Sequence, residues 1–159
     1  MAEPTPLALV DLLGRRELRI RTGILELPVE TIGNESNLAV GLGVGWRDIC
    51  AWKLSVTPGD RTHLGLSWEM MTQDLVSLLS DLSLPGHCVW VTNLDVLLAA
   101  IAFDDRKRFW GFMRISFRQS RGLLLSMPQG ASRLLPKDER ALWLEYGRLS
   151  TWTNHSCEI

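Results

Sequence analysis

Short apolar runs alternate with longer segments of helical spacing along this 159-residue chain. Residues 88–91 and 123–126 are almost wholly apolar, which is typical of strands that are buried on both faces. The spacing of apolar residues predicts one helix that Ser67 caps, a second over residues 104–119, and a closing helix that begins at Pro136. Strands and helices that alternate in this way favour an α/β fold with a mainly parallel sheet and helices on both faces.

The first third of the chain has a different pattern. Residues 6–13 form a short apolar segment that ends at Gly14 and predicts a helix. Apolar and polar positions then alternate on both sides of Thr22-Gly23, which indicates a β-hairpin. We therefore expect a single domain over residues 1–159, in which an N-terminal helix and hairpin (1–33) precede the α/β core (38–150).

Glycine stands at every second position in the middle of the segment NLAVGLGVGW. Residues 38–40 fit a buried strand, and residues 46–54 have the spacing of a short helix. The turn between them would contain three glycines, Gly41, Gly43 and Gly45. A strand that leads into a glycine turn and a helix N-terminus is suited to phosphate binding, because free backbone N–H groups and the helix dipole point at the anion.

The complete phosphate-loop motif, GxxxxGK[ST], is absent from this turn. Trp46 stands five residues after Gly41 and is followed by Arg47 and Asp48. The lysine that reaches the outer phosphates and the hydroxyl that holds magnesium are therefore both missing. The turn predicts weak phosphate binding, and the alternative is a turn in which glycine only allows close backbone packing.

An acidic residue follows one buried strand in the sequence HCVWVTNLD, and a hydroxyl ends another in RGLLLSMP. Over about residues 38–135 this pattern resembles the core of a small AAA-type P-loop ATPase, and it is similar to the small ATPase-like subunits of BREX-type phage-defence operons. The resemblance implies that Asp95 and Ser126 contact ATP or ADP with Mg²⁺ beside the glycine turn. It also implies that Arg118 or Arg121 reaches the nucleotide of a neighbouring subunit.

The same resemblance indicates that catalysis is absent. Asn93 and Leu94 stand where such ATPases often carry an aspartate followed by a glutamate, so the base that activates water is missing. Phosphoryl transfer depends on positioning and charge stabilisation, and a site without its lysine, hydroxyl and base has lost most of both. We therefore expect no catalytic residues.

Cations recur at helical spacing from residue 107 onward. Steps of seven, four and three residues would place four of them on one helix face, namely Lys107, Arg114, Arg118 and Arg121. Such a basic stripe predicts contact with phosphates, nucleic acid or an acidic protein, and the alternative is an ordinary solvated face.

Composition narrows the classes of function. Lys and Arg number 17 against 18 Asp and Glu, and the net charge of -1 provides no overall field that would attract nucleic acid or a membrane. The chain shows neither a basic leader nor a long apolar span, so we expect a cytoplasmic protein with no membrane partner. Three cysteines and three histidines are scattered without the spacing of a metal site.

These observations favour a non-catalytic or weakly nucleotide-binding, P-loop-like subunit of a larger complex, in phage defence or DNA transactions. Other protein subunits are its expected partners, and nucleic acid would bind only through the basic stripe. Two alternatives stay open. One is an interaction or scaffold protein without a nucleotide site, and the other is a small enzyme whose site the sequence does not identify.

Overall fold

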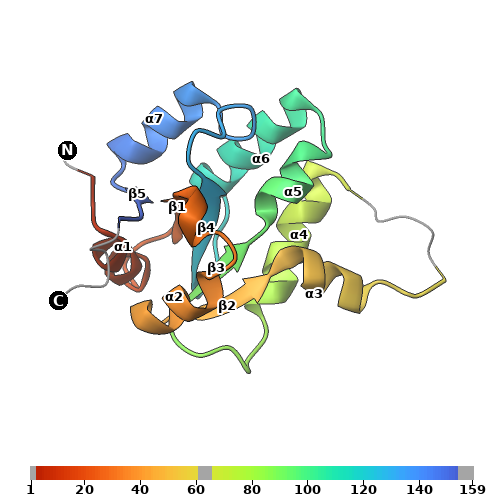
Figure 1. Cartoon of the computed structure of the whole chain (residues 1–159), viewed down its shortest axis with the longest axis horizontal. Helices are drawn as coiled ribbons and strands as arrows, with labels where there is room; N and C mark the ends of the chain where they lie inside the picture. Colours follow the sequence, from red (N-terminus) through yellow and green to blue (C-terminus); the bar gives the residue numbers. More distant parts are fainter. Residues whose placement is uncertain (1–2, 61–65, 154–159) are drawn as a thin grey trace.

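The computed structural model describes residues 3–60 and 66–153 and has a parallel β-sheet at its centre (Figure 1). Within these described residues, five strands lie in the order β2-β3-β4-β1-β5, and every neighbouring pair is parallel. Their bounds are β1 (Thr22–Leu27), β2 (Gly45–Asp48), β3 (Cys88–Thr92), β4 (Gly122–Pro128) and β5 (Leu149–Thr151). The α/β class and the parallel sheet are confirmed.

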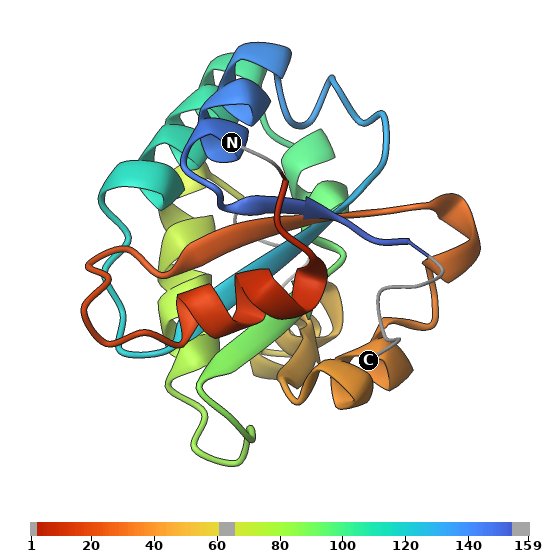
Figure 2. The ribbon, with the colours of Figure 1, turned by 90° about the vertical axis from the view of Figure 1, so that its left-hand side faces the viewer.

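One face of the sheet is covered by α1 (Pro6–Leu13) and α2 (Glu35–Leu42). Figure 2 shows α1 lying across this face, with α4 and α6 behind the sheet. Leu9 and Leu13 of α1 pack in one cluster with Leu25, Trp90 and Leu124 of the sheet. Side chains of successive strand residues point to opposite faces of the sheet. The residues between those named here therefore pack against the helices on the other face.

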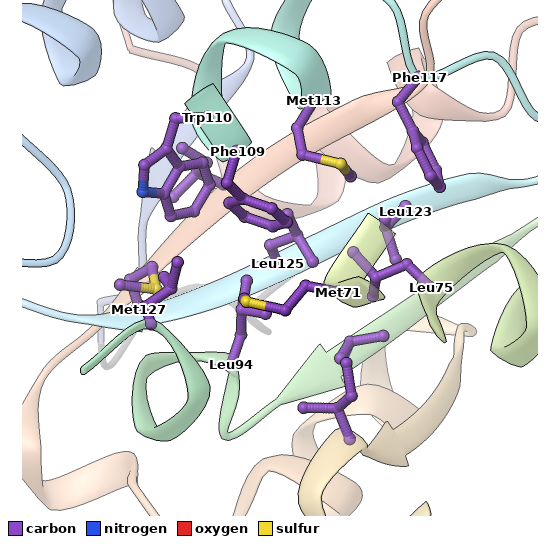
Figure 3. Packing of buried hydrophobic residues seen from close by; sticks show 14 of the residues in the cluster. Met71, Leu75, Leu94, Phe109, Trp110, Met113, Phe117, Leu123, Leu125 and Met127 are labelled. Carbon is purple, nitrogen blue, oxygen red and sulfur yellow. The ribbon is translucent and has the colours of Figure 1, made fainter. Parts of the chain in front are cut away.

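The opposite face carries the larger core. Its helices are α3 (Ile49–Val56), α4 (Trp68–Leu79), α5 (Leu94–Ala99), α6 (Phe103–Ile115) and α7 (Lys137–Glu145). Figure 3 shows Phe109 and Met113 of α6 above Leu123 and Leu125 of β4. Both faces of the central strands are therefore buried, which explains their continuous apolar runs.

Several predicted helix boundaries are confirmed. The α1 helix ends before Gly14, and α7 begins after Pro136. The Ser67 hydroxyl caps α4 by accepting a hydrogen bond from the Met70 N–H at 3.1 Å. Among the described residues, no helix is long and apolar enough to cross a membrane.

The predicted N-terminal hairpin is wrong. Residues 18–20 form no strand, and β1 pairs in parallel with β4 and β5 rather than with its own N-terminal neighbour. Gly23 lies inside β1, where a Cβ atom would be 3.0 Å from Leu13 Cδ1 of α1. This glycine therefore permits the close approach of a helix and does not form a turn.

The strand predicted at residues 38–40 is also wrong, because these residues lie within α2. Gly43 ends that helix in the left-handed conformation, with φ of 71°, and β2 begins at Gly45. Glycine in this conformation is the common end of a helix. The order here is thus helix, glycine turn and strand, the reverse of the predicted strand, glycine turn and helix.

Candidate functional site

The carboxyl ends of β1, β3 and β4 form the edge of the sheet where a ligand site is expected. The connection after β1 leads to α2 on one face, whereas the connections after β3 and β4 lead to α5 and α7 on the other face. Open parallel sheets bind ligands in the crevice where neighbouring connections diverge in this way. We therefore take this edge as the candidate site.

A small cavity of about 30 Å³ lies at this edge. Its lining comes from the ends of β1, β3 and β4 and from the connections that follow them: Leu27, Ile32, Glu35, Asn93, Asp95, Ser126, Met127 and Pro128. A volume of this size holds water but is far below the several hundred Å³ of typical ligand pockets. No Lys or Arg of the described part of the chain lines this cavity.

The structure brings together two of the five residues that the sequence predicts at a nucleotide site. Asp95 and Ser126 both line the cavity at the carboxyl edge. Gly45 begins β2 at the amino edge of the sheet and is paired with Val89 near the start of β3. Gly43, two residues earlier, ends α2 and begins the turn into β2. Gly41 lies in the last turn of α2. Glycine turn and carboxylate therefore lie at opposite edges of the sheet, and the predicted site does not assemble.

The connection between β1 and α2 can be compared with a phosphate loop. It follows a central strand and leads into a helix, which is the context of a phosphate loop. Its sequence, PVETIGNES, has Gly33 followed by Asn34 and Glu35 where the motif requires Lys and Ser or Thr. The short helical turn η1 (Val29–Thr31) begins this connection.

Glu35 occupies the first turn of α2 and turns back toward its own connection. Its Oε2 accepts a hydrogen bond from the Gly33 N–H at 2.9 Å, and the residue is only 8% exposed. A helix N-terminus attracts anions because its first N–H groups have no partner in the helix. Here the Glu35 carboxylate binds an N–H of the connection just before the helix, so a phosphate that approached this helix N-terminus would meet a buried carboxylate of the chain itself.

Asp95, the second residue of α5, lies half-buried next to this carboxylate in the cavity lining. Burial raises the pKa of the Asp95 carboxyl above its usual value, and the negative charge of Glu35 raises it further. The N–H groups of Asp95 and Val96 act in the opposite direction because they stabilise the charged form. The site therefore disfavours negative charge where a nucleotide would add more.

The Asp95 environment predicts a pH-dependent stability. The pKa of Asp95 is higher in the folded state than in the unfolded state, so its protonated form favours folding. This contribution to stability is complete below about pH 4 and is lost as the pH rises through the folded-state pKa. The Asp95→Asn variant, which stays neutral and keeps an acceptor oxygen, should therefore be more stable than wild type in urea unfolding at pH 7. This advantage should disappear below about pH 4.

A matched control is Asp104→Asn, since Asp104 is the second residue of α6 and is exposed. It should give no gain at pH 7, because an exposed carboxylate in a first helical turn is favourable to the helix dipole. An equal gain in both variants would show that the effect is not specific to the Asp95 site.

Asn93 holds the ends of β2 and β3 together. The sequence pattern does not indicate this role, because it marks Asn93 only as a position where an acidic residue of AAA-type ATPases is absent. Asn93 has a left-handed backbone, with φ of 65°, and its Nδ2 donates to Asp48 Oδ2 at 2.9 Å. Asp48 in turn caps α3 by accepting from the Cys50 and Ala51 N–H groups. Burial raises the pKa of the Cys50 thiol, and Asp48 and Asp95 raise it further, so the thiol is not an activated nucleophile.

Ser126 is buried, and its hydroxyl donates to the Val91 carbonyl oxygen of the adjacent strand at 3.3 Å. Among residues 3–60 and 66–153, no three His, Cys, Asp or Glu side chains are grouped to hold a metal ion. The lining of the small cavity brings Glu35 and Asp95 together, but its described residues include no Lys or Arg side chain that could pair with the phosphates of a nucleotide with Mg²⁺.

The predicted basic stripe is not one helix face. The α6 helix ends at Ile115, so Arg118 and Arg121 lie beyond it. Arg114 is turned inward and pairs with Glu139, at 2.7 Å between Nε and Oε1. Contact with a partner stays a prediction for the exposed Lys107 and Arg118.

Arg121, the fourth residue of that set, is committed to the chain's own backbone. Its guanidinium group donates to carbonyl oxygens at the end of α4 and in the following loop, with Leu84 O at 2.6 Å and Asp81 O at 2.8 Å. The residue therefore fixes the loop that leads into β3.

Comparisons with protein-family models, with curated proteins and with solved structures find no match to this chain.

Proposed function

We propose that this chain is a non-catalytic, P-loop-like subunit of a larger complex and that it acts through protein contacts. One observation carries the proposal, namely the buried Glu35 carboxylate, which binds the Gly33 N–H in the connection just before α2. That position is where a phosphate loop would bind phosphate. Of the three functions that the sequence left open, this geometry favours a subunit without a working nucleotide site.

Electrostatics support the proposal. A triphosphate in this cavity would meet Glu35 and Asp95, and the described residues of its lining include no Lys or Arg to offset the repulsion. In nucleotide sites, charge-assisted hydrogen bonds from Lys or Arg supply much of the phosphate affinity. The cavity would also have to expand about tenfold to reach the size of ordinary ligand pockets.

Exposed apolar side chains at the same edge support protein contacts. Val29 and Ile32, in the connection between β1 and α2, are 81% and 46% exposed. Val96, next to Asp95 in α5, is also exposed. Apolar side chains that cluster around a closed polar site are suited to the centre of a protein interface. The resemblance to subunits of BREX-type operons suggests phage defence or DNA transactions as the setting.

The nucleotide test uses Mg-ATP and Mg-ADP with the whole chain. Calorimetry should show no binding of either nucleotide, and phosphate release from ATP should be the same background rate for wild type and for Asp95→Asn. A turnover that disappears in the Asp95→Asn variant would contradict the proposal.

The partner test compares two exposed valines. Val29→Asp should weaken co-purification with native partners, because it places a charge at the centre of the proposed contact. Val40→Asp is the matched control, since Val40 is 79% exposed on α2. Equal retention of partners by both variants would move the contact surface away from the carboxyl edge.

A further inference from the structure

A second hollow lies at the amino edge of the sheet, away from the Glu35–Asp95 cavity. Its volume is about 360 Å³, within the range of small-molecule sites. Apolar side chains and two guanidinium groups line it: Leu18, Ile20, Arg114, Ile115, Tyr146 and Arg148. Among the residues that the structure describes, none with a carboxylate lines this hollow.

Arg148, which immediately precedes β5, is a buried cation in this lining and is only 8% exposed. Its Nη2 donates to the Arg114 carbonyl oxygen at 2.7 Å, and its Nη1 makes longer contacts with Ile20 O at 3.4 Å and Thr22 Oγ1 at 3.5 Å. Its Nε–H finds no acceptor within the described part of the chain. The guanidinium lies 4.7 Å from the centre of the Trp143 ring.

No carboxylate among the described residues forms an ion pair with Arg148. Burial, together with the positive charge of Arg114, lowers the pKa of Arg148 to about 10. The group is still charged at neutral pH. A buried charge without a counter-ion is unfavourable, so an anion that enters the hollow would relieve it.

The neighbouring charges leave one positive charge unbalanced. Glu139 is paired with Arg114, and both side chains are largely buried. The contacts of the Arg148 guanidinium within the described residues are to carbonyl oxygens, a hydroxyl and aromatic rings. One uncompensated cation beside several apolar walls matches a monoanion with an apolar body better than a strongly hydrated phosphate dianion.

We propose that this hollow binds a carboxylate carried on a short aliphatic body, with Arg148 as counter-ion and Leu18, Ile20, Ile115 and Tyr146 around the aliphatic part. A free aliphatic acid and the C-terminus of a peptide share this chemistry. The site is at the opposite edge of the sheet from the cavity of the proposed function and does not depend on it.

Hexanoate is the probe, and hexanamide, which has the same body without the charge, is its matched control. Hexanoate should bind saturably in calorimetry and raise the melting temperature, whereas hexanamide should do neither. Equal effects of the two compounds would overturn the proposal. So would an affinity of hexanoate weaker than about 10 mM, or tighter binding of inorganic phosphate.

Two variants locate the site. Arg148→Met should weaken hexanoate binding at least about tenfold, the size of one lost charge-assisted contact. Because Arg148 also holds carbonyl groups, Ile115→Glu is the variant that keeps the fold. Ile115 is 59% exposed, and a carboxylate there would supply an internal counter-ion and abolish hexanoate binding. Unchanged hexanoate affinity in a folded Ile115→Glu protein would overturn the proposal.

A final arm distinguishes the source of the carboxylate. An acetylated alanyl-alanyl-leucine peptide is compared in its free-carboxylate and amidated forms. Tighter binding of the free-carboxylate peptide than of hexanoate identifies a peptide C-terminus, and weaker binding identifies a free acid. Either result supports a carboxylate site, whereas binding of the amidated peptide as tight as that of the free form overturns it.

Discussion

Arg121→Met is expected to lower the free energy of unfolding by about 3 kcal/mol, because a hydrogen bond from a charged donor is worth about 1.5–3 kcal/mol and this half-buried side chain loses several together. Nη1 of Arg121 donates to the carbonyl oxygens of Leu79 and Asp81, at 3.2 and 2.8 Å. Nη2 donates to those of Leu84 and Gly86, at 2.6 and 3.3 Å. Methionine fills a similar length but leaves these four carbonyls without this donor, so the loop before β3 should loosen.

Arg118→Met is the matched control, since Arg118 is an exposed arginine three residues earlier. Its effect on the free energy of unfolding should stay within about 0.5 kcal/mol, as for most surface substitutions. Urea unfolding followed by tryptophan fluorescence measures both variants. Similar losses for the two would mean that Arg121 contributes through its charge and not through the four carbonyl contacts.

The fold class could be predicted because the central strands have a strong and local signal. Strands β3 and β4 are buried on both faces, and this burial appears in the sequence as continuous apolar runs. The Ser67 cap and the Pro136 start are equally local, because a cap depends on side chains within one helical turn. These features together were enough to indicate strands that alternate with helices.

The errors arose where the same residue types serve a tertiary purpose. Gly23 had the appearance of a turn residue, but it lies in β1 because Leu9 and Leu13 of α1 pack closely on it. Residues 38–40 are apolar and β-like, yet they belong to an eight-residue helix that ends at Gly43. The strand β5 has three residues, too few for a periodic signal.

The candidate site was half predictable for a related reason. Asp95 and Ser126 follow strands that the sequence identifies, so their place at the carboxyl edge could be inferred. The sequence analysis does not identify Glu35, because it assigns the residues of β1 to a hairpin. With that assignment, the segment after β1 is not recognised as a connection from a parallel strand to a helix. The sequence Gly33-Asn34-Glu35 is the signal that a correct strand assignment would have exposed.

The predicted basic stripe is wrong because the helical spacing of its cations continues past Ile115, where α6 ends. Ser116 follows α6, and neither glycine nor proline marks this boundary in the sequence. Arginines beyond a helix end are free to turn inward, and Arg121 donates to backbone carbonyls of the loop before β3. Charge spacing therefore predicts a surface only where the helix itself continues.

Gly122→Ala is expected to lower the free energy of unfolding by about 2 kcal/mol, within the range for overpacked positions. A Cβ atom at this position would lie 2.9 Å from the Leu13 carbonyl oxygen and 3.0 Å from Leu13 Cβ. It would also lie 3.3 Å from Cys88 Cβ of the adjacent strand. Since the closest atom belongs to the backbone, the end of α1 has to move away from β4, on the face of the sheet where Figure 2 shows α1.

Gly111→Ala is the matched control, and it is expected to raise the free energy of unfolding. Gly111 lies within α6, and a Cβ atom there would have no other atom within 4 Å. Alanine should therefore stabilise the protein by about 0.5–1 kcal/mol, because it restricts the unfolded chain and favours the helix. Thermal and urea unfolding of both variants measure the difference. A Gly122→Ala protein as stable as Gly111→Ala would mean that α1 does not lie against the start of β4, and the layer that covers this face of the sheet would have to be placed differently.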